Sequence, residues 1–272
     1  MPERTAFRLF GKPDLKSAYL VVTWNEDGGR LGTRIADYLA RSLDGEEFAQ
    51  IDPPDFFPLG GVAIEDDVAR FPTSKFYQCR RNLALFTSSP PRYDWYRFLD
   101  TVMDVARDYC HVRELYTVGA MVTMNPHTVP RQMVTVSNGP EMTQVLKDFG
   151  VASDMDFETP PGQRPTLNSF LIWVAERRNI PAATLWVPVP FYLANIDDPQ
   201  AALVVLRFLD RRAELGLDFS ELSEEVRRQN ERLEQARRHS PDVDGALRRL
   251  ENNIALTQEE SEKLMKGLED YL

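Results

Sequence analysis

The stretch VVTWNEDGGRLGTRIADYL contains the residues whose types and spacing most resemble a ligand-binding loop. A dinucleotide-binding fingerprint places G-x-G-x-x-G between a strand and a helix, with an acid about 20 residues further on. Gly29 and Gly32 match its second and third glycines, and Asp52 stands where the ribose-binding acid is expected. Asp27 replaces the first glycine, and together with Glu26 it would oppose the binding of a pyrophosphate at the helix N-terminus. The sequence therefore favours a tight turn from strand to helix, with nucleotide binding as the weaker alternative.

The sequence offers little for nucleophilic catalysis. It contains no G-x-S-x-G motif, and Ser88 and Ser89 precede two prolines, which is typical of a turn. Among the histidines, only His127 falls in a predicted loop between strands, where it could act as a base. Because no acid or nucleophile can be paired with it from the sequence, we expect a structural histidine held by hydrogen bonds.

Metal and cofactor sites are not expected either. Cys79 and Cys110 are the only cysteines, and they lack the close paired spacing of a zinc or redox site. Cys110 and His111 are adjacent rather than spaced for chelation, and no H-x-x-x-H motif or carboxylate triplet occurs. We therefore predict no metal and no cofactor, and a reducing compartment as the natural environment.

Composition narrows the partners. The chain of 272 residues has a formal net charge of −10, which argues against nucleic acid because binding to phosphate backbones depends on clustered Lys and Arg. The N-terminal segment lacks the apolar core of a signal peptide, and nowhere do about 18 apolar residues follow one another. We expect a cytoplasmic protein that does not bind membranes.

The elements that position these residues alternate between strand and helix. Apolar runs predict strands, and apolar residues at helical spacing after turn or capping residues predict helices. The predicted strands are 18–23, 48–51, 75–80, 82–87, 115–120, 133–137 and 183–187, and the predicted helices follow Gly32 and span 93–109, 140–149, 166–178 and 200–215. This alternation predicts an α/β domain over residues 1–216, with a largely parallel sheet covered on both faces.

Residues 217–272 differ in composition and predict a helical extension. Three helix starts are marked by Asp218, by Ser240 before Pro241, and by Thr257 with Glu260 three residues later. Apolar residues then recur at spacings of three and four, which forms a narrow stripe on each helix. Such a stripe packs against either the chain's own core or a partner subunit, and the sequence leaves both possibilities open.

Three stretches together resemble the proteasome assembly chaperone family, in particular its bacterial members of unknown function. They are TWNEDGGRLGTRIADYL (23–39), GAMVTMNPHTVPRQMVTVSNGPEM (119–142) and ATLWVPVPFYLANIDDPQAALVVLRFL (183–209), and RRHSPDVDGALRRLE (237–251) is similar to a helical extension of those members. The resemblance implies a phosphorylase-like three-layer α/β/α sandwich and a homo-oligomer, often a trimer among bacterial members. It also implies proteasome subunits as possible partners, since eukaryotic and archaeal relatives bind them, and it implies no established catalytic residue.

Two functions follow as expectations. We favour a non-enzymatic protein-binding or assembly-chaperone-like protein. The alternative is a hydrolase or nucleoside-phosphorylase-like enzyme, with a pocket at the carboxyl edge of the sheet formed by Asn25, Asp27, His127 and Tyr192.

Two segments suggest protein contacts. The stretch from Trp186 to Leu193 contains more large apolar side chains than a short strand and loop would be expected to bury, which predicts a homo-oligomer with a trimer preferred. The chain ends in GLEDYL, and Tyr271 and Leu272 resemble the Gly-Gln-Tyr-Leu end of bacterial proteasome activators, whereas Asp270 departs from it. The alternative is that Tyr271 packs on its own subunit.

Overall fold

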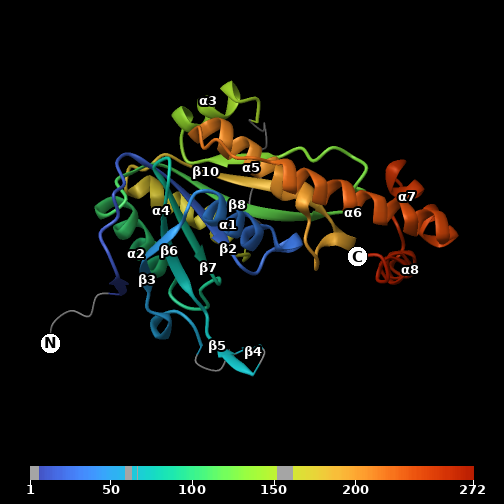
Figure 1. Cartoon of the computed structure of the whole chain (residues 1–272), viewed down its shortest axis with the longest axis horizontal. Helices are drawn as coiled ribbons and strands as arrows, with labels where there is room; N and C mark the ends of the chain where they lie inside the picture. The colour runs from blue at the N-terminus through green and yellow to red at the C-terminus, as the bar shows by residue number, and fades with distance from the viewer. Residues whose placement is uncertain (1–5, 59–62, 66, 152–161) are drawn as a thin grey trace.

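The computed structural model describes residues 6–58, 63–65, 67–151 and 162–272 (Figure 1). Its strands are β1 (Phe7–Leu9), β2 (Ala18–Trp24), β3 (Glu46–Ile51), β4 (Ala63–Glu65), β5 (Val68–Arg70), β6 (Ser74–Cys79), β7 (Leu83–Ser88), β8 (Val112–Thr123), β9 (Val134–Ser137) and β10 (Ala182–Pro190). Its helices are α1 (Leu31–Ser42), α2 (Trp95–Asp108), α3 (Pro140–Asp148), α4 (Leu167–Arg177), α5 (Pro199–Ala213), α6 (Ser220–His239), α7 (Pro241–Glu251) and α8 (Gln258–Leu268). Short 3₁₀ turns occur at Gly28–Arg30, Pro53–Asp55 and Phe191–Leu193.

One mixed sheet organises the α/β part, in the order β1-β3-β6-β7-β2-β8-β10-β9. The central strands β7, β2, β8 and β10 are parallel, with Val22 opposite Phe86 and Thr117, and Leu185 opposite Val118. At both margins the strands are antiparallel. Of these strands, β2 and β10 are almost continuously buried, as expected for parallel strands with helices on both faces.

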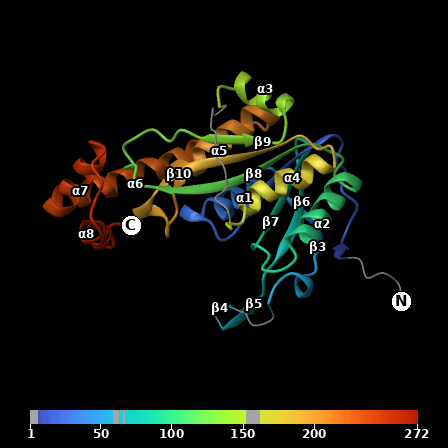
Figure 2. The same cartoon turned by 180° about the vertical axis from the view of Figure 1, so that it is seen from behind.

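Helices cover both faces of the sheet, as the two opposite views show (Figures 1 and 2). One face packs against α1, α3 and α5, where Leu31, Ile35 and Leu206 are fully buried. The other packs against α2 and α4, where Phe98, Val102 and Leu171 are fully buried. The predicted three-layer α/β/α sandwich is thus confirmed, and the predicted, mostly parallel pairing is found in the core of the sheet.

The helical extension lies at the end of the molecule away from β3 and β6, and α6 continues alongside α5 (Figure 1). Helices α7 and α8 begin where the capping residues predicted, whereas the N-cap of α6 is Phe219, one residue after the predicted Asp218. Ser240 and Thr257 accept backbone hydrogen bonds from the first turns of α7 and α8, and Asp218 accepts one from Ser220. Leu222, Leu233 and other stripe residues are buried against the α1 and α5 side of the core. The stripes therefore pack on the chain itself, one of the two possibilities that the sequence left open.

The apolar stretch from Trp186 to Leu193 is also covered by its own chain. Val187, Val189 and Leu193 are fully buried, Tyr192 is 7% exposed, and Trp186 and Phe191 are half-buried. The prediction that this stretch leaves apolar surface unburied, on which the expectation of an oligomer was based, is therefore wrong. The stretch contains β10, which packs against α4 on one face of the sheet and α5 on the other.

Candidate functional site

The carboxyl ends of β2, β8 and β10 lie at one edge of the sheet, and their following loops meet there. These loops contain the four residues predicted to form a pocket. In open α/β sheets ligands bind outside the carboxyl ends of the strands, so this edge is the first place to look for a site.

The glycine turn after β2 is built for close packing. Gly29 has a φ of +68°, in the left-handed region that glycine enters without strain, and its N–H donates to the Ala194 carbonyl (2.7 Å). A Cβ on Gly32 would lie 2.2 Å from the Trp24 carbonyl oxygen, so only glycine lets α1 approach β2 this closely. The turn thus fixes helix against strand, as the sequence favoured. Asp52, which stands at the position of the ribose-binding acid in the fingerprint, pairs with Arg8 (2.6 Å).

Asp27 closes this turn with its own side chain. Both carboxylate oxygens accept the Gly32 N–H, at 3.0 and 3.1 Å. Burial raises the pKa of Asp27 to about 7, even though backbone hydrogen bonds from Gly32 and Leu31 lower it. Asp27 therefore changes charge near neutral pH, an unusual property for a carboxyl group.

Asp27 also lines a cavity of about 290 Å³ on the α4 side of this edge. Trp24, Asn168 and Trp186 form other parts of its wall. Asn168 Oδ1 accepts hydrogen bonds from the Trp24 indole (2.5 Å) and the Thr117 hydroxyl (2.6 Å), which holds this wall rigid. The cavity offers apolar indole surface beside a titratable carboxyl group.

His127 and Tyr192 form a pair on the loops after β8 and β10. The Tyr192 hydroxyl lies 2.8 Å from His127 Nδ1 and accepts the His127 backbone N–H at 2.7 Å. Burial is the main cause that lowers the pKa of His127 to about 4, and it raises the pKa of Tyr192. The imidazole is therefore neutral at pH 7, and its Nδ1 is already engaged.

A buried ion pair beside them was not anticipated from the sequence. Arg131 and Asp198 lie 2.8 Å apart, with side chains 4% and 0% exposed. Arg131 also donates to the Pro188 carbonyl (3.1 Å), and Asp198 Oδ1 caps α5 by accepting the Ala201 N–H (3.1 Å). The sequence indicated the cap through Asp198-Pro199, but nothing in it connected Asp198 to Arg131.

The four predicted pocket residues separate into three places. His127 and Tyr192 are in direct contact, Asp27 lines the cavity on the other side of the turn, and Asn25 accepts a hydrogen bond from Thr87 (2.9 Å). Within the described part of the chain, no hydrogen bond or ion pair joins His127 or Tyr192 to Asn25 or Asp27. The described residues also contain no group of three or more His, Cys, Asp or Glu side chains that could hold a metal ion.

Comparison with known proteins gives the family. A family model matches residues 26–237 and is described as the PAC2 family. The chain belongs to the PAC2 family. No curated protein matches this sequence.

Solved structures of PAC2-like fold are similar over most of the chain. A Mycobacterium tuberculosis protein of unknown function is 22% identical with a TM-score of 0.77, covering 93% of this chain and 92% of its own. A M. tuberculosis proteasome-assembly chaperone homologue is 20% identical with a TM-score of 0.65, covering 90% and 98%. The Pyrococcus furiosus protein PbaB, an archaeal proteasome activator, is 18% identical with a TM-score of 0.67, covering 84% and 97%. These likenesses confirm the fold.

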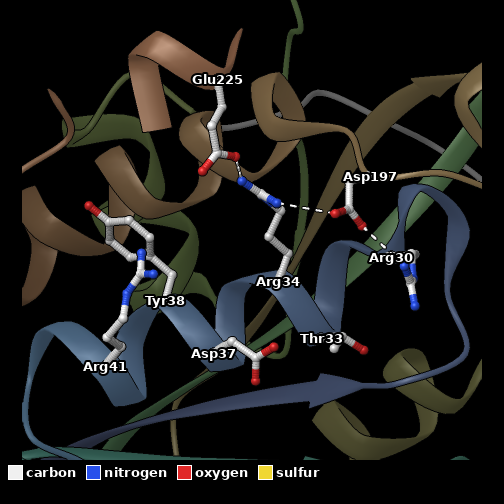
Figure 3. A pocket seen from close by; sticks show the side chains of 8 residues that line it. All are labelled: Arg30, Thr33, Arg34, Asp37, Tyr38, Arg41, Asp197 and Glu225. Carbon is white, nitrogen blue, oxygen red and sulfur yellow. Dashed lines mark hydrogen bonds and ion pairs between the residues drawn. The ribbon is translucent and has the colours of Figure 1, made fainter. Parts of the chain in front are cut away.

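In this PAC2 family member a groove of about 340 Å³ runs between α1 and the helical extension (Figure 3). Arg34 reaches from α1 to Glu225 on α6 and to Asp197 (3.2 Å) in the loop before α5. Nearby, the Tyr38 hydroxyl donates to the Asp218 carbonyl (2.5 Å). These contacts fasten the extension to α1, so the groove marks the joint between the two parts of the chain.

Tyr271 and Leu272, at the end of the helical extension, lie against α6. The Tyr271 ring stacks on His239, with ring centroids 6.2 Å apart. The backbone N–H of Tyr271 donates to the Leu268 carbonyl (3.0 Å). Leu272 lines a hollow of about 420 Å³ that adjoins the groove, beside Arg228 and other residues of α6. Both residues are half-buried. In the part of the chain that the structure describes, no helix is both long and apolar enough to cross a membrane.

Proposed function

We propose that this chain is a non-enzymatic, protein-binding protein of the assembly-chaperone type, related to the proteasome and acting as a homo-oligomer in the cytoplasm. The observation that carries the proposal is the PAC2 match over residues 26–237. Two proteins of the same fold, described as a proteasome-assembly chaperone homologue and a proteasome activator, indicate the kind of partner. The sequence resemblance favours a trimer and names proteasome subunits as the partners to test first.

The contacts of the candidate catalytic groups agree with this proposal. His127 Nδ1 is hydrogen-bonded to the Tyr192 hydroxyl, and both Asp27 carboxylate oxygens accept the Gly32 N–H. These contacts stabilise the loops at the carboxyl edge of the sheet.

A pull-down from the native host tests the proposal. The tagged chain should recover proteasome subunits above the level retained by an unrelated tagged protein of similar charge. Recovery of no proteasome subunit, with the tagged chain folded and abundant, would contradict the proposed partner.

The C-terminal tail supplies a sharper version of this experiment. We propose that Tyr271 and Leu272 detach from α6 and bind a proteasome core through the terminal carboxylate and the tyrosine ring. A variant with Tyr271→Ala and Leu272 deleted should bind a purified core from the same host at least tenfold more weakly. Met265→Ala is the matched control, because Met265 is 40% exposed on the neighbouring helix α8. Equal binding by the tail variant would show that the tail belongs to the fold alone.

One observation favours the alternative, an enzyme or small-molecule-binding protein. Asp27, with a pKa of about 7, lines the 290 Å³ cavity together with two indole rings. A thermal-shift screen with nucleosides and phosphate checks this reading, since a ligand at 100 times its Kd stabilises a protein by about 2.7 kcal/mol. A shift that disappears in Asp27→Asn would support the alternative, and no shift would exclude these ligand classes.

A further inference from the structure

The cavity of about 290 Å³ at the carboxyl edge of the sheet, here called the indole cavity, has rigid walls. Trp24 and Trp186 line it from β2 and β10, and Asn168 lines it from α4. Trp24 and Asn168 are buried, and the Trp24 indole N–H donates to Asn168 Oδ1, so packing and a hydrogen bond fix both side chains. Ligand sites in proteins usually measure about 300–1,000 Å³, so this cavity fits a small molecule.

One negative charge in this cavity has no cationic side chain beside it. Glu26 and Asp27 are the titratable residues of the described wall. Glu26 forms an ion pair with Arg92 (2.9 Å), so its charge is balanced. Asp27 accepts backbone N–H groups, and no ion pair joins it to a Lys or Arg among the described residues. The wall therefore carries one uncompensated negative charge whenever Asp27 is ionised.

The Asp27 carboxylate retains capacity for a ligand. Its two oxygens together offer about four lone-pair positions. The single N–H of Gly32 is shared between them, at 3.0 and 3.1 Å. Because Asp27 lines the indole cavity, a hydrogen-bond donor or a cation in the cavity can reach the remaining positions.

Indole rings and an uncompensated carboxylate attract the same class of ligand. A cation is attracted by the negative face of an indole ring, most strongly where water is excluded. The Asp27 carboxylate attracts it as well, and a half-buried charge is screened less than a fully exposed one. A phosphate or carboxylate ligand would instead meet a like charge. The first turn of α4 also reaches the cavity, but Thr166 already accepts its Ser169 N–H (3.1 Å), so the turn offers an anion one donor fewer.

We propose that the indole cavity binds a small organic cation, a protonated amine or a quaternary ammonium, with its charge beside Asp27 and its carbon groups against Trp24 and Trp186. The inference goes beyond the proposed function, because the site needs no catalytic group and a protein of the assembly-chaperone type can carry it. Burial raises the pKa of Asp27 to about 7, so the cation competes with a proton for the same carboxylate. Binding should therefore weaken as pH falls.

Isothermal titration calorimetry with two pairs of probes tests the proposal at pH 8, where Asp27 is ionised. Choline is compared with dimethylbutanol, its neutral analogue, and phenethylamine is compared with phenylethanol. The affinity of each cation should exceed that of its neutral analogue by about tenfold or more, because only the cation gains from the carboxylate and the ring faces. Tighter binding of phenethylamine than of choline would identify a protonated amine that donates a hydrogen bond to Asp27, and the reverse order would identify a quaternary ammonium.

Removing the charge of Asp27 tests its role in the cavity. Asp27→Asn should bind both cations about tenfold or more weakly at pH 8, because asparagine keeps an acceptor for the Gly32 N–H but carries no charge. Asp44→Asn is the matched control, since Asp44 is exposed and follows the opposite end of α1. Between pH 8 and pH 6 the wild-type affinity should fall by about tenfold, as a carboxyl group with a pKa of about 7 becomes protonated. Asp27→Asn should show no such fall, which separates Asp27 from Glu26.

Trp186→Leu tests the indole wall, since it keeps an apolar side chain but removes the ring. It should weaken the binding of choline more than that of dimethylbutanol, whereas Trp186→Phe should retain most of the preference for the cation. Equal affinities for a cation and its neutral analogue, or wild-type binding by Asp27→Asn, would overturn the proposal, and so would no binding of either cation at millimolar concentration. None of these results alters the expected recovery of proteasome subunits, so the proposed function and this site fail separately.

Discussion

Two buried titratable residues at the carboxyl edge of the sheet oppose each other in their effect on stability. The pKa of Asp27 is raised from 3.8 to about 7, so the folded state binds more protons than the unfolded state between these values. Its contribution to stability is therefore present at low pH and is lost as pH rises toward 7. The pKa of His127 is lowered from 6.5 to about 4, so its contribution is lost as pH falls through that window. Between pH 5 and pH 7 these two contributions therefore largely cancel each other.

Replacing Asp27 with asparagine should expose this compensation. Asparagine keeps an oxygen that can accept the Gly32 N–H but cannot ionise. The free energy of unfolding of Asp27→Asn minus that of wild type should therefore be higher at pH 8 than at pH 5, by about 2 kcal/mol. Urea unfolding at both pH values measures the difference. A variant whose effect is equal at pH 5 and pH 8 would show that Asp27 has an ordinary pKa.

The complementary change is at His127. His127→Asn removes the titrating imidazole and its contact with the Tyr192 hydroxyl, so it should destabilise the protein at pH 7.5 by about 1 kcal/mol. At pH 5 the variant should be more stable than wild type. In wild type the imidazole is protonated in the unfolded state and must lose that proton on folding, which costs stability, whereas asparagine carries no such proton. A loss of equal size at both pH values would contradict the lowered pKa.

At the scale of elements, the contact between β2 and α1 depends on a missing side chain. Gly32→Ala would place a Cβ 2.2 Å from the Trp24 carbonyl, so it should cost about 2 kcal/mol or more as the helix moves away from the strand. Gly245→Ala is the matched control, because a Cβ there meets no atom within 4 Å and alanine favours the interior of α7. It should stabilise by about 0.5–1 kcal/mol. Chemical denaturation measures the free energy of unfolding of both variants. If Gly32→Ala is as stable as wild type, the close contact between α1 and β2 does not require glycine at this position.

Sequence patterns located most elements because they depend on local signals. The apolar run before the glycine turn, Asp198-Pro199 and the Thr257 capping box each correspond to an observed strand or helix end. The antiparallel pairing of β9 with β10 was not predictable, since it depends on contacts between residues far apart in the sequence. The candidate site shows the same limit. His127 and Tyr192 were singled out separately and found together, whereas Asp27 and Asn25 were placed elsewhere by the path of the turn.

For the whole molecule, the open question is how far the helical extension stabilises the α/β part. Each face of the sheet has its own hydrophobic cluster, and the cluster on the α2 and α4 face contains no residue of the extension. The cluster on the opposite face continues into the extension, where Leu222, Leu233 and Ala236 are buried. Arg34 with Glu225, and Thr128 with Glu251 (3.1 Å), add polar contacts across the joint.

These contacts define the prediction for a chain truncated after Gly216. The sheet and the helices on both of its faces lie before this residue, so the truncated chain should still unfold cooperatively as an α/β domain of residues 1–216. Its stability should be lower than that of the whole chain by several kcal/mol, because the apolar surface of α1 and α5 beneath α6 becomes exposed to water. Thermal unfolding followed by near-ultraviolet and far-ultraviolet circular dichroism separates the outcomes. Coincident, sigmoidal transitions would establish residues 217–272 as an appendage to a self-sufficient domain. Loss of the near-ultraviolet signal with helices retained would show instead that the extension completes the core, and that the two predicted domains fold as one unit.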